Sequence, residues 1–179
     1  LDSALQNHPL GTDILTPEVL SNLIVKADLK SGVDTKIDCE QYPLITLYLD
    51  PAKYEKGDHF NEGLFKVHSY HEFTHLIDRL NSAFGLGLSV DLQPNEERIW
   101  NVYIDGRLWR RDIKVKSFDD YKQTLFGTRL QMGYNCSKAI NKSKIVWDAE
   151  NLTFKSISKL TKEITQLAAS SPKTNVEGR

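Results

Sequence analysis

The sequence of 179 residues has little cysteine and no long apolar run. Its two cysteines, Cys39 and Cys136, are too few for a disulfide framework and are not spaced as a metal-binding pair, so we interpret them as reduced thiols of a cytoplasmic chain. No segment reaches the roughly 18 to 20 apolar residues that cross a bilayer, and the N-terminal residues lack the layout of a signal peptide. We therefore expect no membrane partner.

Positive and negative charges are also nearly balanced. The chain has 23 Lys and Arg residues against 24 Asp and Glu residues, a formal net charge of -1, which gives no overall field that attracts nucleic acid. We therefore expect no nucleic-acid partner. Hydrophobic residues make up 40% of the chain, enough for a packed core. The length fits one domain, which we place at residues 1–170, followed by an extended or disordered tail at residues 171–179.

Local patterns predict strands early in the chain and helices after them. Thr16 and Pro17 are typical of the start of a helix, here of about three turns, and β-branched residues predict strands within residues 35–50. Apolar residues at intervals of three and four predict a helix over about residues 64–81. Further helices are predicted over about residues 94–111, 118–132 and 152–169.

The most informative stretch is His71-Glu72-Phe73-Thr74-His75, an H-E-x-x-H motif inside a predicted helix. Residues four apart on a helix differ by about 40° in azimuth, so both imidazoles face one side and can share one Zn²⁺. The neighbouring Glu72 can take a proton from an attacking water and pass it to a leaving amine. The motif therefore predicts zinc as cofactor and metalloprotease chemistry with Glu72 as general base and acid.

A third zinc ligand has to come from elsewhere, because no histidine follows His75 and the metzincin pattern is thereby excluded. The predicted helix from Pro94 offers Glu96 and Glu97. A ligand at Glu97 brings Asn101 onto the same face, where its amide oxygen can accept a hydrogen bond from the distal nitrogen of a ligating histidine. We favour Glu97 for this reason, and Glu96, which points about 100° away, stays as the alternative.

A zinc peptidase also needs a group that stabilises the oxyanion formed at the scissile carbonyl. The nearest candidates are Tyr103, Arg107 and His59, and each is equally explained by packing, surface charge or a solvated loop position. His68 lies three residues before His71, and we interpret it as a packing or hydrogen-bonded group outside the site. The sequence does not choose among the three candidates.

The H-E-x-x-H helix, the short glycine-containing linker and the glutamate-bearing helix resemble a gluzincin metallopeptidase. The run Asn95-Glu-Glu-Arg-Ile-Trp-Asn-Val-Tyr-Ile-Asp-Gly-Arg further resembles the compact minigluzincins. The resemblance implies an α+β fold in which a small, mostly antiparallel sheet lies over the active-site helix and the glutamate-bearing helix, with additional C-terminal helices. It also implies zinc held by His71, His75 and the helix-borne glutamate, and a latent or self-inhibited state.

Together these patterns predict a zinc-dependent endopeptidase that hydrolyses extended peptides or unfolded proteins. The alternative is a non-catalytic, zinc-containing binding or regulatory module on a peptidase fold. Glu72 argues against this alternative, because a structural zinc site has no use for that acid and closes with a fourth protein ligand. For the tail at residues 171–179 we favour a disordered terminus; the alternative is that it lies extended in its own cleft or in that of a second copy, which would allow self-association.

Overall fold

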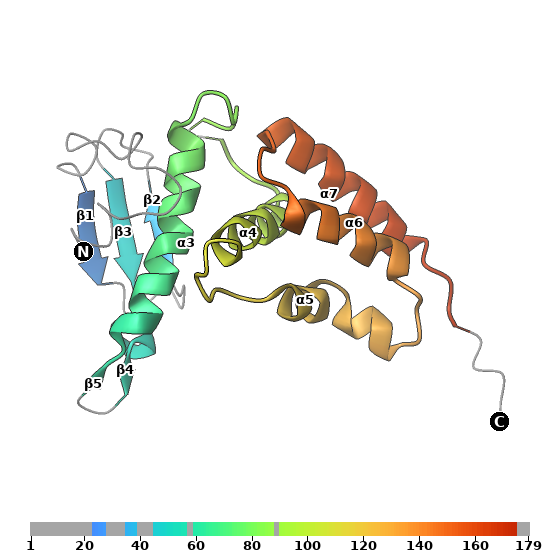
Figure 1. Cartoon of the computed structure of the whole chain (residues 1–179), viewed down its shortest axis with the longest axis horizontal. Helices are drawn as coiled ribbons and strands as arrows, with labels where there is room; N and C mark the ends of the chain where they lie inside the picture. Colours follow the sequence, from blue (N-terminus) through green and yellow to red (C-terminus); the bar gives the residue numbers. More distant parts are fainter. Residues whose placement is uncertain (1–22, 28–34, 39–44, 57–58, 88–89, 175–179) are drawn as a thin grey trace. The chain divides into compact units, whose positions relative to one another are not determined.

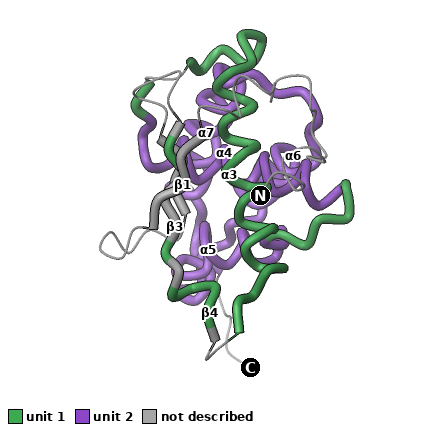
Figure 2. Tube along the Cα trace, turned by 90° about the vertical axis from the view of Figure 1, so that its left-hand side faces the viewer, with its two compact units in different colours: residues 1–91, 111–115 green, residues 92–110, 116–179 purple. Residues whose placement is uncertain are grey.

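The computed structural model describes residues 23–27, 35–38, 45–56, 59–87 and 90–174. The chain divides into two compact units, which are coloured in Figure 2. Unit 1 holds residues 1–91 and 111–115, and unit 2 holds residues 92–110 and 116–179. Each unit is described by itself below. Across the described ranges, no helix combines the length and the apolar character needed to span a membrane.

Unit 1 contains short strands and one long helix (Figure 1). Its three-stranded sheet has the order β1-β3-β2, with β3 parallel to β1 and antiparallel to β2. A second pair, β4 and β5, is antiparallel and follows a short 3-10 helix, η1. The bounds are β1 Leu23–Ala27, β2 Thr35–Asp38, β3 Ile45–Leu49, η1 Pro51–Lys53, β4 Glu55–Lys56 and β5 His59–Phe60.

Helix α3, Glu62–Leu80, carries the H-E-x-x-H motif. It begins where the side chain of Asn61 accepts a hydrogen bond from the backbone N–H of Leu64 at 2.9 Å, which satisfies one of the free donors of the first turn. Its buried side is an apolar stripe at helical spacing, and α3 packs against β2 within unit 1. The stripe comprises Tyr70, Phe73, Leu76 and Ile77. Burial of this stripe fixes the rotation of the helix, and with it the direction in which the histidines point.

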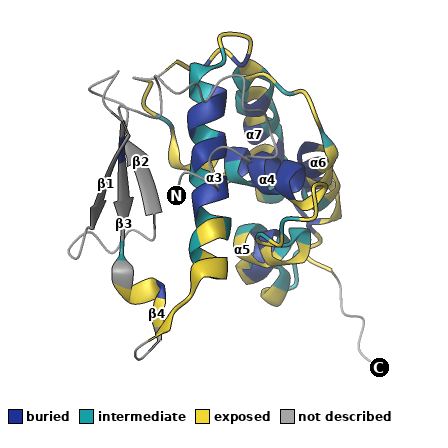
Figure 3. Ribbon diagram, turned by 60° about the vertical axis from the view of Figure 1, so that its left-hand side comes forward, coloured by how far each residue is buried: buried dark blue, intermediate teal, exposed yellow. Residues whose placement is uncertain are grey.

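The described part of unit 2 is a bundle of four helices, in which α4 is central and α5, α6 and α7 pack around it. Helix α4 is buried along most of its length, as Figure 3 shows, and it contacts all three of its partners. Its first turn is closed by a capping box between Gln93 and Glu96. Helices α6 and α7 also pack against each other. The bounds are α4 Pro94–Trp109, α5 Phe118–Gln131, α6 Ser137–Asp148 and α7 Phe154–Ala169.

The contact between α4 and α6 depends on a glycine and an arginine. A Cβ atom at Gly106 would overlap the carbonyl oxygen of Trp147 and lie 2.9 Å from its carbonyl carbon, so only glycine permits this approach. One turn later, the guanidinium of Arg110 donates to the carbonyl oxygens of Trp147 and of Ala149, the latter at 2.6 Å, and to the carboxylate of Glu150 at 2.7 Å. Arg110 thereby satisfies carbonyl groups at the C-terminal end of α6.

The predicted fold class is wrong. The described residues are mainly helical, with helices of 12 to 19 residues against strands of five residues or fewer, so this is not an α+β fold with a mostly antiparallel sheet. In addition, β1 pairs with β3 in parallel. Local sequence patterns predict strands but not the direction in which they pair, because pairing depends on residues far apart in the chain.

The predictions for individual helices are partly right. The helices predicted near residues 64–81, 94–111, 118–132 and 152–169 are confirmed as α3, α4, α5 and α7. The predicted helix from Thr16 falls mostly outside the described residues, and its end is wrong because Leu23–Ala27 is strand β1. Helix α6 was not predicted, although Cys136, Ala139, Ser143 and Val146 bury one face at helical spacing.

The described part of the predicted tail is attached to unit 2. The backbone N–H of Asn135 donates to the carbonyl oxygen of Pro172 at 2.8 Å, and the N–H of Thr174 donates to the carbonyl oxygen of Gly133 at 2.6 Å. Tyr134 and Lys173 form an antiparallel bridge between these two hydrogen bonds. Residues 172–174 therefore run beside the turn between α5 and α6, and residues 175–179 lie outside the described part of the chain.

Candidate metal centre

The two histidines of the motif converge on one side of α3. The Nε2 atoms of His71 and His75 are 3.2 Å apart, and their rings are 4.9 Å apart at 72°. Two nitrogens bound to one tetrahedral zinc at about 2.0–2.1 Å are about 3.3 Å from each other, so this separation fits a shared ion. It also fits a hydrogen bond in which one ring donates its Nε2–H to the other.

Two acidic residues flank this pair on α3. Glu72 is half-buried and adjacent to His71, at the position where the motif places a general base. Asp78 is only 2% exposed and lies three residues after His75 on the same face of the helix. Sequence analysis did not single out Asp78, although its spacing of three from His75 was visible.

His68 is held by a buried tyrosine from an earlier segment. The hydroxyl group of Tyr54 lies 3.0 Å from Nδ1 of His68, and the two rings meet edge to face at 5.6 Å. Tyr54 is itself 1% exposed and packs against Phe60 and Phe65 at 6.1 Å and 5.5 Å between ring centroids. The interpretation of His68 as a hydrogen-bonded group is confirmed, and one turn separates this ring from His71.

Unit 2 gives the two candidate glutamates different surroundings. The carboxylate of Glu96 accepts a hydrogen bond from the hydroxyl of Ser158 on α7 at 2.5 Å and another from the backbone N–H of Gln93 at 3.3 Å. Glu97 is exposed, and within the described residues its carboxylate forms no hydrogen bond or ion pair. The neighbouring acids therefore differ in role: Glu96 joins α4 to α7, whereas the carboxylate of Glu97 is not engaged by unit 2.

The Asn101 side chain has an unusual feature. Its Oδ1 atom is buried and has no hydrogen-bond partner among the described residues. Leaving a buried amide oxygen unsatisfied costs about 1–3 kcal/mol, so native structures seldom keep one without a reason. An imidazole N–H is a donor of the right kind for this oxygen. The donor set of two histidines, one carboxylate and this acceptor therefore fits zinc and its supporting hydrogen bonds.

The three candidates for oxyanion stabilisation have identifiable surroundings. The Tyr103 hydroxyl donates its proton to the carbonyl oxygen of Glu150 at 2.8 Å and accepts from the N–H of Leu152 at 3.0 Å, so it supports the connection between α6 and α7. Arg107 is buried, with its guanidinium 4.2 Å from the centroid of the Tyr103 ring. His59 is exposed on β5. In this arrangement the hydroxyl proton of Tyr103 is engaged in the hydrogen bond to Glu150 and is not free to bind an oxyanion.

The structure does not gather a complete ligand set. Among the described residues, no third histidine, cysteine, aspartate or glutamate joins His71 and His75 in a group that could hold a metal ion. The histidine pair belongs to unit 1, whereas Glu97 and Asn101 belong to unit 2. Comparison of the chain with models of protein families, with curated proteins and with solved structures found no match.

Proposed function

We propose that this chain is a zinc-dependent endopeptidase of the gluzincin kind that cleaves extended peptides or unfolded proteins in the cytoplasm. The observation that carries the proposal is the 3.2 Å separation of the two Nε2 atoms on a helix that also carries Glu72. Glu97 from α4 is the proposed third ligand. The unsatisfied Oδ1 of Asn101, one turn further along α4, supports that choice.

The roles of the residues follow from their chemistry. His71, His75 and Glu97 would hold the zinc ion. When bound, zinc supplies Lewis-acid activation of water and carbonyl groups at neutral pH. Glu72 takes a proton from the attacking water and delivers it to the leaving amine, a role that requires a carboxylate beside the ligands and not among them. Asn101 orients one imidazole by accepting its distal N–H, which fixes the nitrogen that faces the ion.

A second candidate function is a non-catalytic binding or regulatory module on the same scaffold. The observation that favours it is that the Nε2 atoms of His71 and His75 lie at hydrogen-bond distance from each other, a contact that can stabilise the helix without catalysis. In such a module the pair would stabilise α3, and Glu72 would have no chemical task. Both candidates hold zinc, so they differ in proteolytic activity and in the consequence of removing Glu72.

The test is metal analysis combined with digestion of a reduced, carboxymethylated protein by the full chain and its variants. We expect one zinc per chain, its loss in His71→Ala and His75→Ala, and its retention in Glu72→Ala, whose activity should fall by about two orders of magnitude or more. Glu62→Ala is the matched control, because it removes an exposed acid from the first turn of the same helix and should keep both zinc and activity. Unchanged zinc in His75→Ala would refute the site, and zinc without activity in the wild type would favour the second candidate.

A further inference from the structure

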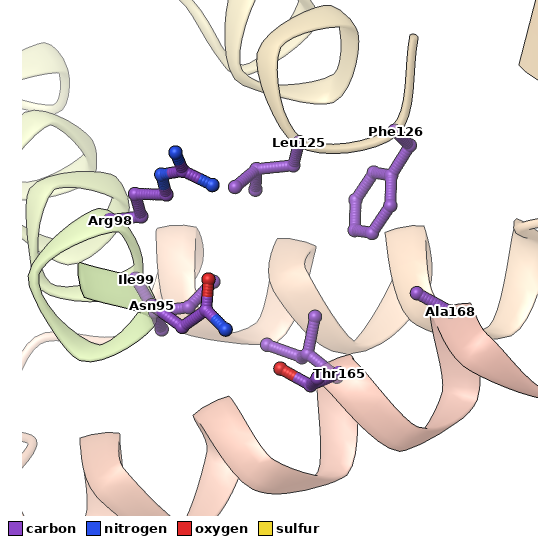
Figure 4. A pocket seen from close by; sticks show the side chains of 8 residues that line it. Asn95, Arg98, Ile99, Leu125, Phe126, Thr165 and Ala168 are labelled. Carbon is purple, nitrogen blue, oxygen red and sulfur yellow. The ribbon is translucent and has the colours of Figure 1, made fainter. Parts of the chain in front are cut away.

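Unit 2 contains a small hollow where α4, α5 and α7 meet (Figure 4). Its volume is about 150 Å³. Most of its lining is apolar and comes from all three helices: Ile99, Leu125, Phe126, Ile164 and Ala168. A cavity of about this size accommodates a benzene ring, so the hollow fits one medium-sized apolar side chain. It lies entirely within unit 2.

Arg98 is the one residue with a charged side chain among the described residues that line this hollow. In Figure 4 its guanidinium extends from α4 toward Leu125. Within the part of the chain that the structure describes, the Arg98 guanidinium forms no hydrogen bond or ion pair. A guanidinium at the edge of an apolar hollow suits a ligand that joins an apolar group to a carboxylate, because the fork of N–H donors binds a carboxylate through two parallel hydrogen bonds.

The charge of the unit favours the same ligand. Residues 92–110 and 116–179 carry 14 Lys and Arg against nine Asp and Glu, a formal charge of +5, whereas the remaining residues carry nine against 15, a formal charge of -6. The near-neutral total therefore conceals two units of opposite sign. A positively charged unit attracts an anionic ligand and raises its local concentration.

A second hollow of about 330 Å³ adjoins the first, because Asn95 and Thr165 line both. Its other lining residues carry amide, hydroxyl or charged groups, although much of the surface that they expose is the apolar part of their side chains: Gln93, Glu96, Thr161, Lys162 and Gln166. Amides and hydroxyls are the groups that hydrogen-bond to a peptide main chain. Glu96 and Lys162 both line this second hollow, so it carries one charge of each sign, whereas Arg98 is the one charged residue described at the small hollow; a ligand carboxylate is therefore favoured at the Arg98 end.

We propose that unit 2 binds the carboxyl-terminal end of a peptide whose last residue is apolar. The last side chain occupies the small hollow, the terminal carboxylate binds Arg98, and the preceding main chain passes Asn95 and Thr165 into the second hollow, where amide and hydroxyl groups are available to it. The second hollow is the reason for choosing a peptide over a free organic acid, which would need the small hollow alone. This site is independent of the zinc proposal, since every residue that lines it belongs to unit 2.

The test is fluorescence anisotropy of the full chain with a labelled peptide ending in Ala-Ala-Leu, as the free acid and as the C-terminal amide. We expect saturable binding of the acid and at least tenfold weaker binding of the amide. Arg98→Gln should weaken the acid at least tenfold, whereas Lys155→Gln, which removes an exposed charge from α7 outside both hollows, should change affinity less than twofold. Ala168→Leu should abolish binding by filling the small hollow.

Several outcomes would overturn the proposal. Equal binding of acid and amide, or full affinity in Arg98→Gln, would remove the carboxylate from the site. Equal competition by 4-methylpentanoate would show that the ligand is a small organic acid and would refute the peptide. A chelator added to the assay should leave binding unchanged, so loss of the zinc proposal and loss of this site are distinguishable. The native tryptophan fluorescence of each variant reports that unit 2 is folded.

Discussion

Replacing Gly106 by alanine should destabilise unit 2, although alanine is the better helix former. Gly106 lies in α4 where the backbone of α6 passes closest to it. An added Cβ would overlap the Trp147 carbonyl oxygen and lie 2.9 Å and 3.0 Å from its carbonyl carbon and Cα. All three atoms are backbone, so rotation of a side chain cannot relieve the contact.

The expected magnitude is a difference between two effects. Alanine gains roughly 1 kcal/mol over glycine in a helix interior. Carbon atoms pack at about 3.5–4.0 Å, so the two carbon contacts alone require a separation of α4 and α6 by about 0.5–1 Å, and the closer contact with the carbonyl oxygen requires more. Overpacking of this kind costs about 1–3 kcal/mol or more. The separation also lengthens the Arg110 hydrogen bonds to Trp147 and Ala149, which adds about 1 kcal/mol. We expect a net loss of about 1–3 kcal/mol in the free energy of unfolding.

The three tryptophans provide the assay. Trp100, Trp109 and Trp147 all lie in unit 2, so their fluorescence during urea unfolding reports that unit. The midpoint should fall with little change in slope, because the same surface is exposed on unfolding. Trp147 is buried against Tyr121, with ring centroids 6.2 Å apart, so its emission is also sensitive to movement of α6.

Gly127 provides the matched control. It lies within α5 of the same unit, and a Cβ there would meet the Oε1 atom of the Gln123 side chain at 3.2 Å. A side-chain end can rotate away, so Gly127→Ala should raise the free energy of unfolding by up to about 1 kcal/mol. Opposite signs for the two substitutions are the expected result. Stabilisation by Gly106→Ala would refute the close approach of α4 and α6 in solution.

Two further predictions concern neighbouring acids and a helix cap. Glu96→Ala should lower the stability of unit 2 by about 1 kcal/mol through loss of the Ser158 contact, and should leave zinc in place. Glu97→Ala should weaken zinc binding without changing the stability of the zinc-free chain. Loss of zinc in Glu96→Ala alone would show that Glu96, and not Glu97, is the ligand. The Ser117 hydroxyl and backbone N–H lower the pKa of Asp120, so this cap stabilises α5 at neutral pH and loses its effect as the pH falls through that lowered pKa. Ser117→Ala should raise the pKa of Asp120 in an NMR titration, and an unchanged pKa would contradict this assignment.

The sequence by itself determined the long helices and the position of the histidine pair. Helical periodicity is a short-range property, and His71 and His75 are four residues apart, so their convergence to 3.2 Å follows from α3 alone. The same reasoning ranked Glu97 over Glu96 from the i+4 position of Asn101. It was less successful with Leu23–Ala27, because a short apolar run is equally compatible with a helix and a strand.

Only the tertiary structure decided the features that depend on residues far apart in the chain. The parallel pairing of β1 with β3 joins strands separated by β2, and the contact of Glu96 with Ser158 joins residues 62 positions apart. The opposite charges of the two units are invisible in a total of -1, because the boundary between the units has to be known before the charges can be counted separately. From the sequence, Gly106 is a residue that weakens a helix, and alanine would be expected to stabilise it. The opposite expectation needs the position of the α6 backbone, because steric overlap depends on two segments that are far apart in the chain.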